Sequence, residues 1–265
     1  MCKRYKGAVF FDIDGTLIDG ARGMYMPSKV TMDALEKLKK NGYMIGIATG
    51  RAKCYIPKIN IDFDCYVTTN GAYAEVNGEE VWNDSIPLKD LSAVVEYLES
   101  EKFGYVLESQ TSCYYSEVGG KEFEKMVKAF DMDISCFYPL KDIDCIKSNK
   151  LNITYKDKEK YRTFIEKFKG IYDITDHPGN PSADVCKVGL TKAVGIKAVI
   201  EHFEINISDT YAFGDGDNDY DMLKFVGTGI AMGNHTERLN DIVEMITDTV
   251  QNEGIYKGLK KLQLI

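Results

Sequence analysis

Two aspartates one residue apart follow directly on a short apolar run near the start of the chain. The run is 8–11, and Asp12 and Asp14 come next, ahead of Gly15. A run this short and continuously apolar predicts a strand buried on both faces. Ligands of open α/β sheets bind beyond the carboxyl ends of the strands, so Asp12 and Asp14 are predicted to face such a crevice. The same residue types occur in solvated turns, and the preceding strand is what favours a functional role.

Strand and helix patterns alternate over the first 70 residues and again after residue 190. This alternation predicts a parallel sheet with right-handed crossover connections. The expected strands are 8–11, 43–48, 64–68, 211–213 and 229–232, and the expected helices are 28–41, 51–57, 191–203 and 219–226. An Asn77-Gly78 pair inside 72–81 predicts a hairpin.

The pattern changes near Asn83, where strands punctuated by helices replace the regular alternation. This favours a separate α+β domain over 84–183, with 84–85 and 178–181 as linkers. The remaining residues, 1–83 and 184–265, are predicted to form the α/β core. Within the insertion, residues 151–155 alternate like a half-exposed strand.

Composition narrows the function classes. The chain has 265 residues, 44% of them hydrophobic, and a net charge of −8, which argues against nucleic-acid binding. Seven scattered cysteines without a Cys-x-x-Cys pair predict free thiols in a reducing cytoplasm. No apolar run approaches the roughly 18 residues of a membrane span, and the start of the chain does not resemble a signal peptide. The sequence does not indicate the oligomeric state.

Polar clusters follow three of the predicted strands. Because the carboxyl ends of parallel strands share one edge of a sheet, these clusters are expected to converge. They are Asp12, Asp14 and Thr16; Thr49 and Gly50; and Asp215, Asn218 and Asp219.

The residue types in these clusters suit phosphoryl transfer. Carboxylates without His or Cys favour Mg²⁺ over Zn²⁺. Asp12 can act as a nucleophile that forms an aspartyl-phosphate, and Asp14 can serve as general acid and base. The Thr49 hydroxyl and the Gly50 amide can donate hydrogen bonds to phosphate oxygens. A lysine is still required for charge.

Four motifs resemble the signatures of the haloacid dehalogenase (HAD) superfamily: 12–16, 49–51, Lys192 and 214–219. Further segments resemble its Cof-like branch of sugar-phosphate phosphatases, namely 70–72, 189–192 and 229–234. The resemblance covers 1–83 and 184–265. It implies a Rossmann-like parallel-sheet core with an α+β cap inserted after the third strand.

The resemblance also implies the site. Mg²⁺ is expected to bind Asp12, the Asp14 backbone carbonyl and Asp215, with Asp219 in a supporting or water-mediated role. Lys192 and Asn218 are expected near the phosphate, together with Thr16, Thr49 and Gly50. Lys187 could compete for the lysine role, but Lys192 is favoured because Thr191-Lys192 opens a helix where this branch places its lysine.

The predicted function is therefore a Mg²⁺-dependent phosphatase for small phosphorylated metabolites, sugar phosphates foremost. A phosphomutase using the same site is the first alternative. A phosphoacceptor signalling domain is the second. Asp14 argues against it because a second carboxylate promotes turnover, and the long insertion argues against it because a cap excludes water. The sequence does not indicate which metabolite is cleaved.

Overall fold

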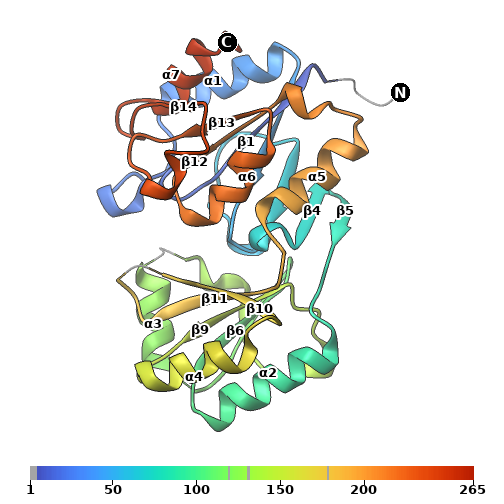
Figure 1. Ribbon diagram of the computed structural model, residues 1–265, viewed down its shortest axis with the longest axis vertical. Coiled ribbons are helices and arrows are strands. Elements are labelled where there is room, and N and C mark those ends of the chain that lie inside the picture. Colours follow the sequence, from blue (N-terminus) through green and yellow to red (C-terminus); the bar gives the residue numbers. More distant parts are fainter. Residues whose placement is uncertain (1–4, 119, 130–131, 178) are drawn as a thin grey trace. The chain divides into compact units, whose positions relative to one another are not determined.

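The computed structural model describes residues 5–118, 120–129, 132–177 and 179–265. Contacts divide the chain into two compact units (Figure 1). Unit 1 comprises Met1–Gly50, Pro57–Trp82 and Thr191–Ile265; unit 2 comprises Arg51–Ile56 and Asn83–Leu190. The short segment 51–56, expected in the core, thus groups with the insertion. The return to unit 1 follows Leu190, after the last strand of unit 2, whereas the sequence pattern indicates residue 183.

Unit 1 is built on an eight-stranded sheet of order β14-β13-β12-β1-β2-β3-β4-β5. The strands from β14 to β3 run parallel, and β4 pairs antiparallel with β3. Their bounds are β1 Gly7–Phe11, β2 Tyr43–Ala48, β3 Cys65–Thr68, β4 Tyr73–Val76, β5 Glu79–Asn83, β12 Thr210–Gly214, β13 Thr228–Ala231 and β14 Met245–Ile246. All five residues of β1 are buried, as predicted for a central parallel strand.

Helices cover both faces of this sheet. They are α1 Lys29–Lys40, α5 Lys192–His202, α6 Tyr220–Phe225 and α7 Gly254–Lys261. Helices α5 and α6 pack on the face that carries Ala8 and Phe10, whereas α1 and α7 contact one another, and Gly258 of α7 lies against Phe213. The α/β fold class predicted for the core is therefore confirmed.

The predicted helix over 51–57 is wrong. The segment forms only the 3₁₀ turn η2, Lys53–Tyr55. Pro57 disfavours helical backbone at the residue before it, and Ile56 is extended. The Tyr55 ring is buried in unit 2. Strand β14 and helix α7 were not expected from the sequence.

Unit 2 contains a six-stranded sheet of order β10-β11-β9-β6-β7-β8. Every described pairing is antiparallel except that of β7 with β8. The strands are β6 Gly104–Glu108, β7 Cys113–Tyr115, β8 Phe137–Pro139, β9 Lys150–Thr154, β10 Tyr172–Asp176 and β11 Ser182–Lys187, and the helices are α2 Leu88–Ser100, α3 Gly120–Ala129 and α4 Lys158–Phe168. The segment predicted as a linker, 178–181, instead joins β10 to β11; Pro178 itself lies outside the described residues.

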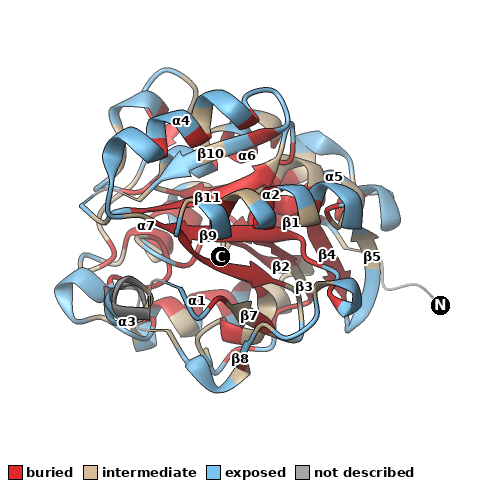
Figure 2. Ribbon diagram, turned by 90° about the horizontal axis from the view of Figure 1, so that it is seen from below, coloured by how far each residue is buried: buried red, intermediate tan, exposed pale blue. Residues whose placement is uncertain are grey.

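Alternate residues of this sheet have opposite character. Apolar side chains of β6, β9 and β11 pack against α2 and α4, the helices that lie along one face of this sheet in Figure 1. The intervening positions form what we call the polar face of unit 2: Glu108, Lys150, Asn152, Thr154, Ser182 and Asp184. All five residues of β9 are buried, so the prediction of a half-exposed strand is wrong. Figure 2 shows the buried strands beside the exposed outer surfaces of α2 and α4.

Among the described residues, no helix combines the length and the apolar character that a membrane crossing requires.

Two glycines with similar backbone angles allow a matched test of the fold. Gly71 has φ +87° and Gly78 has φ +84°. A Cβ on Gly71 would lie 1.9 Å from the Thr191 carbonyl oxygen, whereas nothing lies within 4 Å of one on Gly78. We expect Gly78→Ala to lower the free energy of unfolding by about 1 kcal/mol, the cost of left-handed backbone. Gly71→Ala should lower it by at least about 3 kcal/mol, because rigid backbone must also move. Urea denaturation of both variants tests this, and equal losses would contradict it.

Candidate active site

Three carboxylates from distant parts of the sequence converge at one edge of the unit 1 sheet. Asp12 follows β1, Asp215 follows β12, and Asp219 ends the 3₁₀ turn η7, Asp217–Asp219. An oxygen of each lies within 4.8 Å of the other two. The convergence follows from the topology, because β1 and β12 are parallel neighbours with Phe11 opposite Phe213.

Lys192, the first residue of α5, is the cation of this cluster. Its Nζ lies 2.6 Å from Asp12 Oδ1 and 2.6 Å from Asp219 Oδ1, and the side chain is 0% exposed. Burial alone lowers the pKa of Lys192, but the two carboxylates raise it above its usual value. The ammonium therefore stays charged. Lys187, the competing candidate, lies on β11 of unit 2 and pairs with Asp84.

Asp219 organises the loop that carries Asp215. Its Oδ1 accepts from Lys192, and its Oδ2 accepts from the backbone N–H groups of Asp215, at 2.8 Å, and Gly216, at 2.9 Å. Since both oxygens are engaged, the geometry favours a positioning role for this side chain.

The cluster sets three carboxyl groups against one ammonium group. Burial, together with the nearby Asp219, raises the pKa of Asp215 to about 9. Burial also raises the pKa of Asp12, to about 7; Asp219 and Asp14 add to this rise, and Lys192 opposes it. Carboxylates with pKa values raised in this way indicate a place that an additional cation would stabilise. The all-oxygen donor set fits a hard ion such as Mg²⁺.

Two neighbours hold Asp215 in place. The Thr16 hydroxyl donates to Asp215 Oδ1 at 3.0 Å. Gly15, at φ +89°, lies so close that a Cβ there would be 2.1 Å from Asp215 Oδ2. A glycine at this position is therefore required by the contact as well as by the backbone angle.

Asp14 differs from Asp12 although only one residue separates them. Asp12 is 6% exposed, whereas the Asp14 side chain is exposed.

A second polar group lies beyond β2 and β3. Thr49 is buried, and its carbonyl oxygen accepts from the Asn70 N–H at 3.1 Å. Gly50 approaches the Asn70 side chain so closely that a Cβ would lie 2.9 Å from Asn70 Oδ1. The same oxygen accepts from Asn218 Nδ2 at 3.4 Å. Asn70 was not among the predicted site residues; its signal was the Asn-Gly pair directly after a strand, which suits its φ of 54°.

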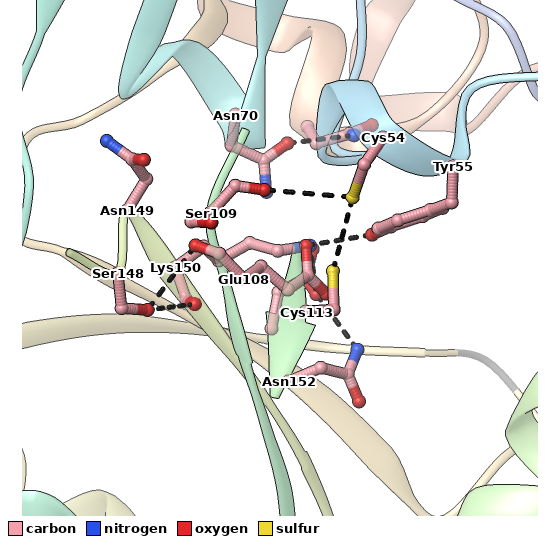
Figure 3. Close-up of polar contacts among 12 residues, drawn as sticks. Cys54, Tyr55, Asn70, Glu108, Ser109, Cys113, Ser148, Asn149, Lys150 and Asn152 are labelled. Carbon is pink, nitrogen blue, oxygen red and sulfur yellow. Dashed lines mark hydrogen bonds and ion pairs between the residues drawn. The ribbon is translucent and has the colours of Figure 1, made fainter. Parts of the chain in front are cut away.

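Unit 2 holds a buried charge network that the sequence did not indicate (Figure 3). Lys150 Nζ lies 2.8 Å from Asp184 Oδ1 and 3.3 Å from Glu108 Oε2. The Tyr55 hydroxyl donates to Glu108 at 2.8 Å, and Asn152 Nδ2 donates to Asp184 at 3.1 Å. Burial by itself raises the pKa of Asp184, but Lys150 and His177 bring it well below its usual range.

Two oxygens near this network lack partners. Asn152 Oδ1 and Thr154 Oγ1, both on β9, are buried and have no hydrogen bond to any described residue. Buried polar atoms are normally satisfied, so these two oxygens are exceptions on the polar face of unit 2.

Comparison with known proteins agrees with the fold. A family model described as haloacid dehalogenase-like hydrolase matches residues 9–259. YkrA of Bacillus subtilis (strain 168), which carries the provisional name of a phosphatase, is 28% identical, with 97% of this chain and 98% of YkrA covered. The solved structure of BT4131, titled a HAD subclass IIB sugar phosphatase, superposes with a TM-score of 0.83 at 26% identity, covering 98% of this chain and all of that one.

YitU of the same B. subtilis strain, named a 5-amino-6-(5-phospho-D-ribitylamino)uracil phosphatase, is 25% identical over 96% of both chains. The fold and these relatives thus define a hydrolase with an α/β core. The chain belongs to the haloacid dehalogenase-like hydrolases, and the family predicted from the four motifs is confirmed.

The depressed pKa of Asp184 leads to a prediction about pH. Its ionised form stabilises the folded state at pH values above the unfolded pKa near 4, and that stabilisation disappears as pH falls through the lower folded pKa. Asp184→Asn should therefore lower the free energy of unfolding by about 3 kcal/mol at pH 7, because Lys150 loses a buried partner.

Urea denaturation from pH 7 to pH 2 measures the difference between parent and variant. We expect it to remain constant to about pH 5 and to shrink below about pH 4. Asp90→Asn, an exposed position on α2, is the matched control and should stay near the parent throughout. A difference that grew at low pH would contradict the prediction.

Proposed function

We propose that this haloacid dehalogenase-like phosphatase is a Mg²⁺-dependent enzyme that hydrolyses small phosphorylated metabolites, sugar phosphates foremost. The observation that carries the proposal is the cluster of Asp12, Asp215 and Asp219 around the buried ammonium of Lys192. Several carboxylates beside one lysine can bind Mg²⁺, and the ion and the lysine together can neutralise the oxygens of a phosphoryl group.

Asp12, Asp215 and the backbone carbonyl of Asp14 would hold Mg²⁺, and Asp219 would support them by fixing the Asp215 loop. The bound ion supplies positive charge against the phosphoryl oxygens.

Asp12 is the proposed nucleophile. Its Oδ1 accepts from Lys192, and its Oδ2 has no hydrogen-bond partner among the described residues. Attack by this carboxylate on phosphorus forms an aspartyl-phosphate while the bond from phosphorus to the leaving oxygen breaks. Lys192 fixes the orientation of the carboxylate throughout.

Asp14 is the proposed acid and base. It gives its proton to the leaving oxygen in the first step. In the second step it takes a proton from water, whose oxygen attacks phosphorus, releasing phosphate and restoring Asp12.

The phosphate contacts are proposed from Thr49, Gly50, Lys192 and Asn218. The close packing of Gly50 and Asn218 on Asn70 supports this grouping. Thr16 was predicted to bind phosphate, but its hydroxyl donates to Asp215. We therefore propose that Thr16 acts by holding that carboxylate.

The substrate class is supported by the names of two relatives. The names of BT4131 and YitU, a sugar phosphatase and a phosphatase for a ribityl phosphate, both point to this class. The acidic net charge and scattered thiols support a cytoplasmic enzyme that acts without nucleic acid or membrane.

Replacing the nucleophile tests the proposal directly. Asp12→Asn should reduce kcat by at least about 10³-fold on a panel of sugar phosphates with Mg²⁺, because the amide cannot attack phosphorus. Asp221→Asn, an exposed carboxylate on α6, should remain near the parent. Retention of activity within tenfold in Asp12→Asn, with the parent active, would overturn the nucleophile assignment. Failure of the parent to hydrolyse any monoester would overturn the function.

Asp14 can be tested through the leaving group. Asp14→Asn should slow hydrolysis of a sugar phosphate by about 10²-fold to 10⁴-fold, the usual contribution of a general acid. The loss on 4-nitrophenyl phosphate should be smaller in the first step, because nitrophenolate leaves without a proton. Rapid-quench measurement of phosphoenzyme formation separates the two steps. Equal losses of phosphoenzyme formation on both substrates would argue against proton donation by Asp14.

A further inference from the structure

Three cysteines from separate segments gather within unit 2. Cys54 lies in η2, Cys113 begins β7, and Cys136 ends the 3₁₀ turn η4, Ile134–Cys136. Their sulfur atoms all lie within 4.8 Å of one another, and those of Cys54 and Cys113 are 3.6 Å apart. Figure 3 shows the Cys54 and Cys113 side chains directed toward each other.

The surroundings of these thiols are mainly apolar. Cys113 belongs to a buried cluster with Tyr55, Val106 and Phe137, and Cys54 and Cys136 pack against that cluster. A single cysteine in such a place behaves as a small apolar side chain. A cluster of three sulfur atoms differs from that case. Ordinary packing would not require the sulfur atoms of all three side chains to point toward one another.

The separations match those of metal ligands. In a tetrahedral site with Zn–S bonds of about 2.3 Å, two sulfur ligands lie about 3.8 Å apart. The 3.6 Å between Cys54 and Cys113 is close to that value, and the 4.8 Å bound on the whole trio needs only small side-chain shifts to reach it.

We propose that Cys54, Cys113 and Cys136 form a three-thiolate site for a thiophilic divalent cation, Zn²⁺ being the ion that this donor set favours. Soft sulfur ligands select Zn²⁺ over the oxygen-seeking Mg²⁺, so this site and the carboxylate cluster of unit 1 prefer different ions. Each thiol that binds the ion releases its proton to solvent. A water molecule can fill the fourth position, as in other three-ligand zinc sites.

The site has a structural consequence because of where Cys54 lies. Residues 51–56 follow Thr49 and Gly50 directly and pack with unit 2. Tyr55 already attaches this segment to Glu108 through its hydroxyl. An ion shared by the three cysteines would link residues 51–56 to β7 through Cys113 and to the start of β8 through Cys136. Binding should therefore stabilise unit 2.

Metal titration of the full chain tests the proposal. Reduced, metal-free protein is titrated with Co²⁺, whose thiolate charge-transfer absorption reports sulfur ligands and is absent from carboxylate sites. We expect one equivalent to produce this absorption, equimolar Zn²⁺ to abolish it, and Zn²⁺ alone to raise the midpoint of thermal unfolding. Cys54→Ser and Cys136→Ser should lose both responses; both positions are only partly buried, so these variants are expected to fold. Cys145→Ser, an exposed cysteine of the same unit, should keep both.

Three results would overturn the proposal. The first is no thiolate absorption with one equivalent of Co²⁺ while all thiols titrate as reduced. The second is absorption that survives in folded Cys54→Ser or Cys136→Ser. The third is reduced protein that binds no Zn²⁺ but forms a Cys54–Cys113 disulfide under mild oxidant. That result would show that the two cysteines are a redox pair.

Discussion

The double ion pair of Lys192 is the interaction on which the site of unit 1 depends. An ammonium group without solvent contact is stable only where negative charge compensates it, and Asp12 and Asp219 provide that charge. The pair also joins three separate segments: the end of β1, the start of α5 and the turn after β12. Asp12 and the loop carrying Asp215 are therefore positioned by the same side chain, and neither can shift without disturbing the other.

Much of this arrangement could be predicted because it follows from local rules. Buried parallel strands appear as continuous apolar runs, and their carboxyl ends must share one edge, so the convergence of Asp12 and Asp215 was predictable from the order of the elements. Lys192 could be preferred over Lys187 only through the family motif. The structure shows that the two lie in different units, a distinction that no spacing rule provides. The proposed roles of the individual site residues remain predictions.

The errors have a common physical origin. Residues 51–57 contain side chains that suit a helix, but Pro57 and the burial of Tyr55 in unit 2 leave a single turn. Strand β9 alternates apolar and polar residues, a pattern that normally indicates one solvent-exposed face. Here the polar face is buried as well, because its side chains join a charge network whose members come from four segments. Tertiary contacts of this kind leave no periodic signal. The cluster of Cys54, Cys113 and Cys136 is hidden from sequence analysis for the same reason, since the spacing between its members follows no metal-binding motif.

The grouping of residues 51–56 with unit 2 changes how the insertion should be regarded. The chain passes between units at four junctions: Gly50–Arg51, Ile56–Pro57, Trp82–Asn83 and Leu190–Thr191. Excising 83–190 alone would strip Ala52 and Tyr55 of their buried surroundings. Exchanging this insertion for another would therefore also require a compatible hexapeptide at residues 51–56, so replacement at a single pair of breakpoints would leave part of unit 2 behind.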